Sequence, residues 1–355
     1  MDWETVDPDG LGMDGLAASI PNCSCRSPPG EVNVFNAVVI IGFLPLLSAF
    51  GLAANIVNMW IYSKSNTSAE RYLMSLSISD FGICLSGILV IAADSLRPHS
   101  FFIDQAFVVL LPKLIPFGLF FQTTSIYITV FAAIDCYVNI SRCLPARSRD
   151  FCTVRAANRV LVGVFVASAS LQRAVQCYAE ELDRELLELC PTEMRVNEDY
   201  ITIYKGVLYV FFMAFFPFVL LCLLTTLIVW ELQRNKSRAI RGQLRAAFYT
   251  AINVHHETPK EEEAEGGSPI VLVLVVVLFL CCNLVSLIVN LAEMAGEGAL
   301  SPEMQSLLID VGNVLVVSNA SANIAIYCYG SISFRQQALD LMGFGRREKI
   351  TRTSL

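Results

Sequence analysis

The stretch VNVFNAVVIIGFLPLLSAFGLAANIVNMWIYS, residues 32–63, contains no charged side chain. A helix that crosses a membrane needs about 20 mostly apolar residues, because the hydrocarbon core is about 30 Å thick and each residue rises about 1.5 Å. This stretch exceeds that requirement. It therefore predicts a transmembrane helix and identifies the bilayer as the solvent of the chain.

Further segments of the same kind follow along the chain. We predict seven spans, at about residues 33–62, 71–94, 107–138, 156–177, 204–232, 269–292 and 304–330. The fourth is free of charge only over residues 160–172, so Arg159 and Arg173 must reach opposite membrane interfaces if it crosses. An interfacial helix is the alternative for that segment. The prediction is an all-α membrane protein built as a seven-helix bundle.

The composition agrees with a membrane protein. Hydrophobic residues make up 55% of the 355 residues and charged residues 16%, against about 25% charged in soluble domains. The mean hydropathy is +0.56 and the net charge is −7. These values argue against a disordered chain, a disulfide scaffold and a nucleic-acid-binding protein. The acidic first residues do not resemble a signal peptide, so we expect a retained span to direct membrane insertion.

Basic residues gather in the loops on one side of the predicted spans. They are Lys64, Arg71, Arg142, Arg147, Arg149, Arg155, Arg234, Lys236, Arg238, Arg241, Arg245, Arg346, Arg347, Lys349 and Arg352. The positive-inside rule then places residues 1–32 outside the cell and the tail in the cytoplasm, as in a plasma-membrane protein. Only the Asn22 glycosylation sequon lies outside in this orientation.

Four cysteines reach the oxidising side: Cys23, Cys25, Cys177 and Cys190. They allow three complete pairings, among which the sequence does not choose.

Polar residues inside the spans are candidate functional groups, because a charge at the centre of a bilayer is costly. The candidates are Asn55, Asp80, Ser125, Asn319 and Asn323. They predict either a polar cluster that fixes helix packing or a site for a small cation such as sodium. The sequence has no metal-ligand spacing, nucleophile elbow or phosphate-binding loop, so we do not expect an enzyme or a further cofactor.

Several motifs resemble those of rhodopsin-like G-protein-coupled receptors from residue 33 to residue 334. Gly51 to Asn55 resembles the G-x-x-x-N of the first helix, and Leu76 to Asp80 resembles the L-x-x-x-D of the second. Pro217 matches the proline of the fifth helix, and Asn323 to Tyr327 resembles N-P-x-x-Y. The resemblance implies a short amphipathic eighth helix within residues 331–355.

A narrower resemblance is to invertebrate, nematode-like FMRFamide-type neuropeptide receptors. Four stretches carry it: residues 191–204, residues 122–127, residues 143–148, and Cys282-Asn283-Leu284 with Asn290 and Glu293. It implies a peptide ligand, signalling through a heterotrimeric G protein, and ligand binding by Gln122, Glu193, Arg195, Tyr204, Glu293 and Asp310.

The chain also departs from the wider family. The D-R-Y triplet reads Asp135-Cys136-Tyr137, so the arginine offered to the G protein is missing. Asn283 replaces the tryptophan of the sixth helix, and Leu111 replaces the cysteine at the outer end of the third. These changes put coupling to a G protein in doubt. The residues that stand at the activation motifs of the family are Asp135, Cys136, Tyr137, Asn283 and Tyr327.

The position that binds the amine in aminergic receptors is Gly118, so a small-amine ligand is disfavoured. The second outer loop is acidic, and such a field attracts a basic ligand. The alternative for these acids is a solvated loop surface. We predict a receptor for a basic amidated peptide; the alternatives are a chemosensory receptor for small molecules and a ligand sink that does not signal. A transporter is disfavoured because internal repeats are lacking.

At the inner side, basic residues after the fifth span predict contact with lipid headgroups or with a G protein. The terminal residues Thr353-Ser354-Leu355 resemble a ligand of PDZ domains.

Overall fold

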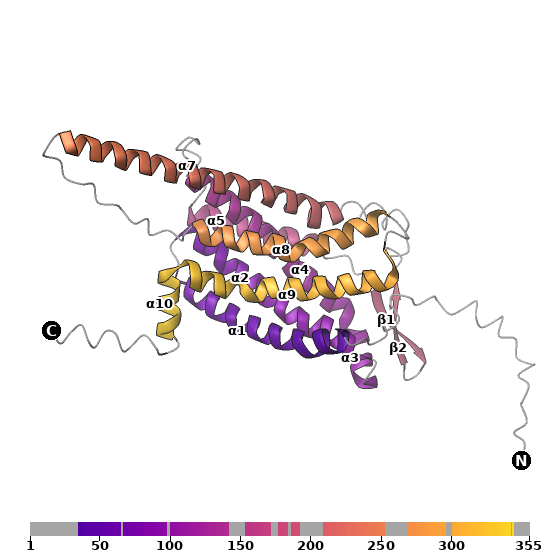
Figure 1. Cartoon of the computed structure of the whole chain (residues 1–355). Coiled ribbons are helices and arrows are strands. Elements are labelled where there is room, and N and C mark those ends of the chain that lie inside the picture. Colours follow the sequence, from indigo (N-terminus) through magenta and orange to yellow (C-terminus); the bar gives the residue numbers. More distant parts are fainter. Residues whose placement is uncertain are drawn as a thin grey trace, which may run out of the picture.

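The computed structural model describes residues 35–64, 67–97, 100–141, 153–171, 177–183, 186–191, 209–252, 269–295, 300–341 and 343. Long helices dominate these residues and lie side by side in a bundle (Figure 1). The predicted all-α bundle is thus confirmed. The helical elements are η1 (Asn36–Phe43), α1 (Leu44–Tyr62), α2 (Ser68–Ser86), η2 (Gly87–Ala92), α3 (Ala93–Leu96), α4 (Phe101–Ile140), α5 (Val154–Leu171), η6 (Phe211–Phe215), α7 (Phe216–Ile252), α8 (Pro269–Ala295), α9 (Pro302–Gly330) and α10 (Ile332–Leu341), where η marks a π-helical turn.

Within the described residues, 6 helices are long and apolar enough to cross a membrane. They are Asn36–Tyr62, Ser68–Leu96, Phe101–Ile140, Phe211–Gly242, Pro269–Ala292 and Glu303–Gly330. The first, second and fourth of these combine a π-helical segment with the α-helix beside it. The chain is therefore a multi-pass membrane protein.

The predicted fourth span corresponds to α5, whose 18 residues make it shorter than the six helices above. This helix packs against α2 and α4. It buries Ala157, Leu161 and Val164, which recur at helical spacing, and exposes Val162 and Val166. One side of α5 thus lies in the bundle and the other carries apolar side chains. That α5 crosses the membrane as the fourth span stays a prediction.

Hydrogen-bonding side chains define where several helices begin. Thr67, Ser100 and Ser301 have extended backbones, and each side-chain oxygen accepts a hydrogen bond from the backbone N–H three residues later. Such caps satisfy N–H groups that have no partner within the helix. They set the starts of α2, α4 and α9.

The outer surface of the bundle is apolar, whereas much of its interior is polar. Leu46 and Phe102 are 72% and 81% exposed, while Asp80 and Asn55 are fully buried. In water this distribution would be unstable, but lipid tails solvate the exposed apolar side chains and the bundle shelters the polar ones.

The two ends of the bundle differ. A hairpin of β1 (Cys177–Asp183) and β2 (Leu186–Pro191) lies at one end, and α10 lies at the other, where α7 extends past its neighbours (Figure 1). The hairpin was not predicted from the sequence. Its register pairs Cys177 with Pro191 and Tyr178 with Cys190. The eighth helix was predicted, and α10 confirms it.

Candidate functional site

The carboxylate of Asp80 joins three helices in the middle of the bundle. On α9, Nδ2 of Asn323 donates a 2.7 Å hydrogen bond to Oδ2 of Asp80, and on α4, Oγ of Ser125 donates a 3.1 Å bond to Oδ1. Asp80 lies on α2 and has no exposed surface. The structure therefore brings together three of the five polar residues that the sequence singled out.

The other two polar residues lie nearby without contacting that carboxylate. Asn55 on α1 donates from Nδ2 to the carbonyl oxygens of Gly51 and Ala320, each at 2.9 Å. Its bond to Ala320 needs a close approach of α1 to α9. Gly51 permits that approach, since a Cβ there would lie 2.3 Å from Oγ of Ser321. Asn319 is buried, and its Oδ1 accepts no hydrogen bond in the described part of the chain.

The direct contacts of Asp80 are those of a polar cluster that fixes helix packing. Each oxygen of Asp80 accepts a hydrogen bond from a side chain, which compensates part of the cost of burial. A carboxylate oxygen has a second lone pair. The residues around Asp80 thus fit a small cation by chemistry, and the sodium site stays a prediction.

The start of α2 and the end of α4 are joined through Asp135. Oγ of Ser68 donates to Oδ2 of Asp135 at 2.9 Å, and Nδ2 of Asn139 donates to the same oxygen at 3.1 Å. The next residue, Cys136, is 9% exposed. Because a cysteine stands there, this buried position carries no cationic group.

Tyr327 on α9 packs into an aromatic cluster at the same end of the bundle. Its ring lies 5.4 Å from that of Tyr62 and 5.5 Å from that of Phe334, measured between ring centres. These contacts join α1, α9 and α10. Tyr137, the last residue of the altered triplet, is half-buried near the end of α4.

A cavity of about 50 Å³ lies between α4, α7 and α8. The residues that line it are Gln122, Thr123, Ile126, Tyr209, Met213, Ala214, Pro217, Phe218, Phe279, Asn283, Ser286, Leu287 and Asn290. Among these described residues none is charged. Gln122, predicted as a ligand contact, and Asn283, predicted as part of an activation motif, thus line the same space.

A hydrogen bond joins α4 to η6, two of whose residues, Met213 and Ala214, line this cavity. Oη of Tyr127 on α4 donates a 2.8 Å bond to the carbonyl oxygen of Phe212. In a π-helical turn this carbonyl would pair with the N–H five residues later, but that residue is Pro217, which has no N–H. Tyr127 supplies the missing donor and joins α4 to η6.

At the hairpin end of the bundle, Asp310 on α9 lies close to η1. Nδ2 of Asn36 is 3.4 Å from Oδ2 of Asp310 and also 3.4 Å from Oγ of Ser95. Asn36 thus connects the first, second and last spans, and the predicted ligand residue Asp310 is half-buried.

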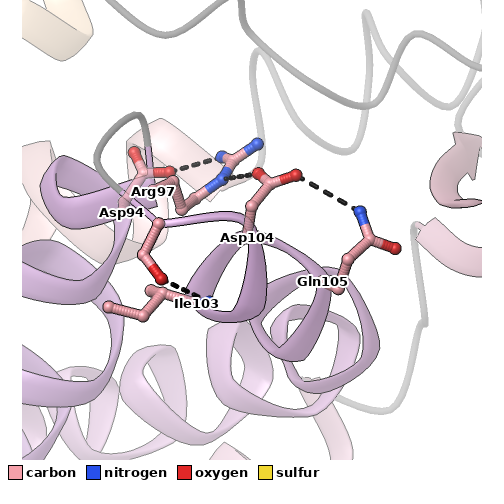
Figure 2. A network of polar contacts seen from close by, with 6 residues as sticks. Asp94, Arg97, Ile103, Asp104 and Gln105 are labelled. Carbon is pink, nitrogen blue, oxygen red and sulfur yellow. Dashed lines mark hydrogen bonds and ion pairs between the residues drawn. The ribbon is translucent and has the colours of Figure 1, made fainter.

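A second polar cluster surrounds Arg97, between α3 and α4 (Figure 2). Its Nη1 lies 2.6 Å from Oδ1 of Asp94, and its Nε lies 2.9 Å from Oδ1 of Asp104. The guanidinium also lies over the ring of Phe107 at 4.9 Å. Burial disfavours the charged guanidinium, but its hydrogen bonds to Asp104 and Asp94 prevail and raise the pKa of Arg97.

Sequence reasoning missed the Arg97 cluster. The spacing of Asp94 and Arg97 is that of neighbours on one helical turn, and Asp104 falls in the first turn after the Ser100 cap. These two signals together would have suggested an ion pair across the turn.

Several predicted residues lie outside the part of the chain that the structure describes. They are Asn22, Cys23, Cys25, Glu193, Arg195, Tyr204 and Leu355. The backbones of Cys177, Cys190 and Glu293 are described in β1, β2 and α8, but their side chains are not. Pairing of the four outer cysteines and ligand contact by Glu193 and Glu293 therefore stay predictions.

Comparison with known proteins gives concordant matches. The sequence model described as "7 transmembrane receptor (rhodopsin family)" matches residues 54–327. The "Probable G-protein coupled receptor frpr-1" of Caenorhabditis elegans is 31% identical over 330 residues, which cover 86% of this chain and 79% of that protein. The "FMRFamide receptor" of Drosophila melanogaster is 27% identical over 315 residues, 85% of this chain and 53% of that protein. The chain thus spans about half the length of the fly relative.

Proposed function

The chain belongs to the rhodopsin family of seven-transmembrane receptors, and on that premise we propose that it is a receptor for a basic amidated neuropeptide of the FMRFamide type. The family is not enzymatic. Its members couple a ligand outside to a G protein inside, through a shift between two arrangements of the bundle. The similarity to the fly receptor and the cavity between α4, α7 and α8 support the proposal.

The cavity is the observation that carries the ligand assignment. It combines aromatic residues, such as Phe218 and Phe279, with the uncharged polar side chains of Gln122, Asn283 and Asn290. Binding sites typically pair an apolar lining with a few polar groups that orient the ligand. The neutral amide at the end of a peptide matches the polar groups of this lining.

The cavity does not suit a small amine. Gly118 stands at the position where aminergic receptors of this family carry an aspartate, and a Cβ there would lie 3.2 Å from Oγ of Ser86. A buried ammonium group without a carboxylate partner is costly. The lack of a carboxylate among the described lining residues favours a ligand whose charge lies outside the cavity.

Acidic residues at the outer end can accept that charge. The side chain of Asp94 is 57% exposed, and Asp310 is half-buried on α9. Glu193 and Glu293 are the further candidates from the sequence. A guanidinium group can bind such carboxylates through two parallel hydrogen bonds, so the arginine of an Arg-Phe terminus would be held above the cavity.

We place the hairpin end of the bundle outside the cell and the α10 end in the cytoplasm. Basic side chains on the inner extension of α7, among them Arg234, Arg238 and Arg241, support this orientation. They are at least partly exposed and can contact lipid headgroups or a G protein. The PDZ-type terminus would lie on the same side.

Within this receptor the Asp80 cluster holds α2, α4 and α9 together at the depth of the membrane. A cation bound by the remaining lone pairs would make ligand affinity depend on sodium. Binding measured in sodium and in choline buffers distinguishes the two roles of the cluster.

A peptide screen tests the proposal. Cells that express the receptor are exposed to amidated peptides ending in Arg-Phe, and binding and second messengers are both recorded. Saturable binding with a messenger response is the expected result. Binding without a response would identify the protein as a ligand sink. Cys136 supports that alternative, because it stands where the family has the arginine offered to the G protein. Absence of binding by every peptide would favour a chemosensory receptor for small molecules.

A further inference from the structure

We infer that Asn283 and Asn290 on α8 make the cavity selective for the neutral terminal amide of a peptide over a free terminal carboxylate. The inference rests on the proposed peptide ligand and adds the residues that distinguish the two forms of its end. Both asparagines line the cavity and lie two helical turns apart, so they share one face of α8.

The two asparagines have a defined polarity. Nδ2 of Asn283 donates to the carbonyl oxygen of Phe279 at 2.9 Å, and Nδ2 of Asn290 donates to that of Ser286 at 2.7 Å. A backbone carbonyl can only accept a hydrogen bond, so the amide nitrogen must face it and the amide oxygen must point elsewhere. Neither Oδ1 accepts a hydrogen bond in the described part of the chain.

On the wall formed by α4, the side chain of Thr123 likewise donates its hydrogen to a backbone carbonyl. Oγ1 of Thr123 donates to the carbonyl oxygen of Leu119 at 2.7 Å and lies 3.4 Å from Sδ of Met213. Its hydroxyl proton is therefore held by the backbone of its own helix. Like the asparagines, Thr123 offers the cavity an oxygen.

Gln122, Ser286 and Tyr209 are the other polar residues of the lining. The side chains of Gln122 and Ser286 form no hydrogen bond to another described residue, so both remain able to donate or accept. A carboxamide needs acceptors for its two N–H groups and a donor for its oxygen. The side-chain oxygens of Asn283 and Asn290 on α8 can accept hydrogen bonds from the two N–H groups of the ligand amide. Gln122 on α4 can donate a hydrogen bond to the oxygen of that amide.

A carboxylate fits this lining poorly. It has only acceptor oxygens, so it would face the unpaired oxygens of Asn283 and Asn290, and no described residue of the lining offers a cation. A buried ion without a counter-charge is strongly disfavoured. A site whose polar groups pair with one ligand group also binds weakly any analogue that leaves those groups unpaired. The free acid should therefore bind at least about 100-fold more weakly than the amide.

The test compares an amidated Arg-Phe peptide with the same peptide as a free acid. Competition binding is measured on cells that express the wild type, Asn283→Leu, Asn290→Leu or Asn290→Lys, with surface expression recorded by an epitope. The affinity ratio of acid to amide is taken within each variant, so differences in folding or expression cancel. Thr226→Val is the matched control, because Oγ1 of Thr226 bonds to the carbonyl of Cys222 on an exposed face of α7.

In the leucine variants we expect the amide preference to fall about tenfold, because an acceptor for the N–H groups is lost. In Asn290→Lys we expect free-acid affinity to rise about tenfold, because a cation now faces the carboxylate. Thr226→Val should keep the wild-type ratio. If the affinity ratio of acid to amide is unchanged in all three α8 variants while the amide still binds, the inference is wrong, but the proposed peptide class stands. If the wild type binds neither form, the proposed peptide class falls and the inference with it.

Discussion

Asn323 on α9 and Asp80 on α2 are separated by 243 residues in the sequence, yet Nδ2 of the first lies 2.7 Å from Oδ2 of the second. Both side chains are buried, at 1% and 0% exposure. The asparagine therefore stabilises the carboxylate at a depth where water cannot do so, and it couples the second span to the last.

Replacing Asn323 by leucine should destabilise the bundle by about 1–3 kcal/mol, because a buried carboxylate loses its shorter hydrogen bond. Asn319→Leu is the matched control: it changes the same residue type on the same helix, and Asn319 does not bond to Asp80. Thermal unfolding of the detergent-solubilised receptor measures the difference. Equal melting temperatures for the two variants would contradict the role assigned to this bond.

The Arg97 cluster gives an internal comparison between two partners of one guanidinium. The side chain of Asp104 is 13% exposed and that of Asp94 is 57% exposed. Asp104→Ala should cost about 1–3 kcal/mol, because it leaves a buried charge with fewer partners, whereas Asp94→Ala should cost less than about 1 kcal/mol. The amount of receptor at the cell surface and its melting temperature test this order. A larger loss in Asp94→Ala would contradict it.

Charge reversal at the outer mouth should weaken the binding of a basic peptide. We expect Glu193→Lys and Glu293→Lys each to reduce affinity by about tenfold at low salt, with a smaller effect at high salt, where charges are screened. Saturation binding at two ionic strengths measures both effects. Unchanged affinity at low salt would show that these acids only solvate the loop.

The altered triplet at the inner end of α4 makes the next prediction. Cys136→Arg restores the cation that the family offers to the G protein, so the maximal messenger response to a bound peptide should rise several-fold while affinity changes little. Cys136→Ala controls for loss of the buried thiol. A response equal to that of the wild type would mean that the missing arginine does not limit signalling.

The positions of the long helices could be predicted because each depends on local composition. Residues 36–62 of the charge-free stretch form η1 and α1. The polar motif residues Asp80, Ser125 and Asn323 meet in the interior because each interrupts an apolar span. Asn55 shows the limit of that reasoning. Its partner is the backbone carbonyl of Ala320, and a backbone group leaves no mark in a sequence pattern.

Features that depend on pairing between segments escaped prediction. The register of β1 and β2 pairs two short strands, and their residues contain acidic and leucine side chains that suit a helix equally well. In η6, the carbonyl of Phe212 accepts its hydrogen bond from Tyr127 on another helix. In each case the decisive partner lies in another element, so its position had to be known first.

Photo-crosslinking tests the central claim most directly. An Arg-Phe amide peptide with a photoreactive phenylalanine analogue at its end is bound to cells that express the receptor, irradiated, and mapped by mass spectrometry. The account predicts labelling of the walls of the cavity, at Gln122 or Thr123 on α4, at Met213, or at Asn283 or Ser286 on α8, which excess unlabelled peptide abolishes. Specific labelling confined to residues 1–32, or to the lipid-facing surface of the bundle, would contradict it.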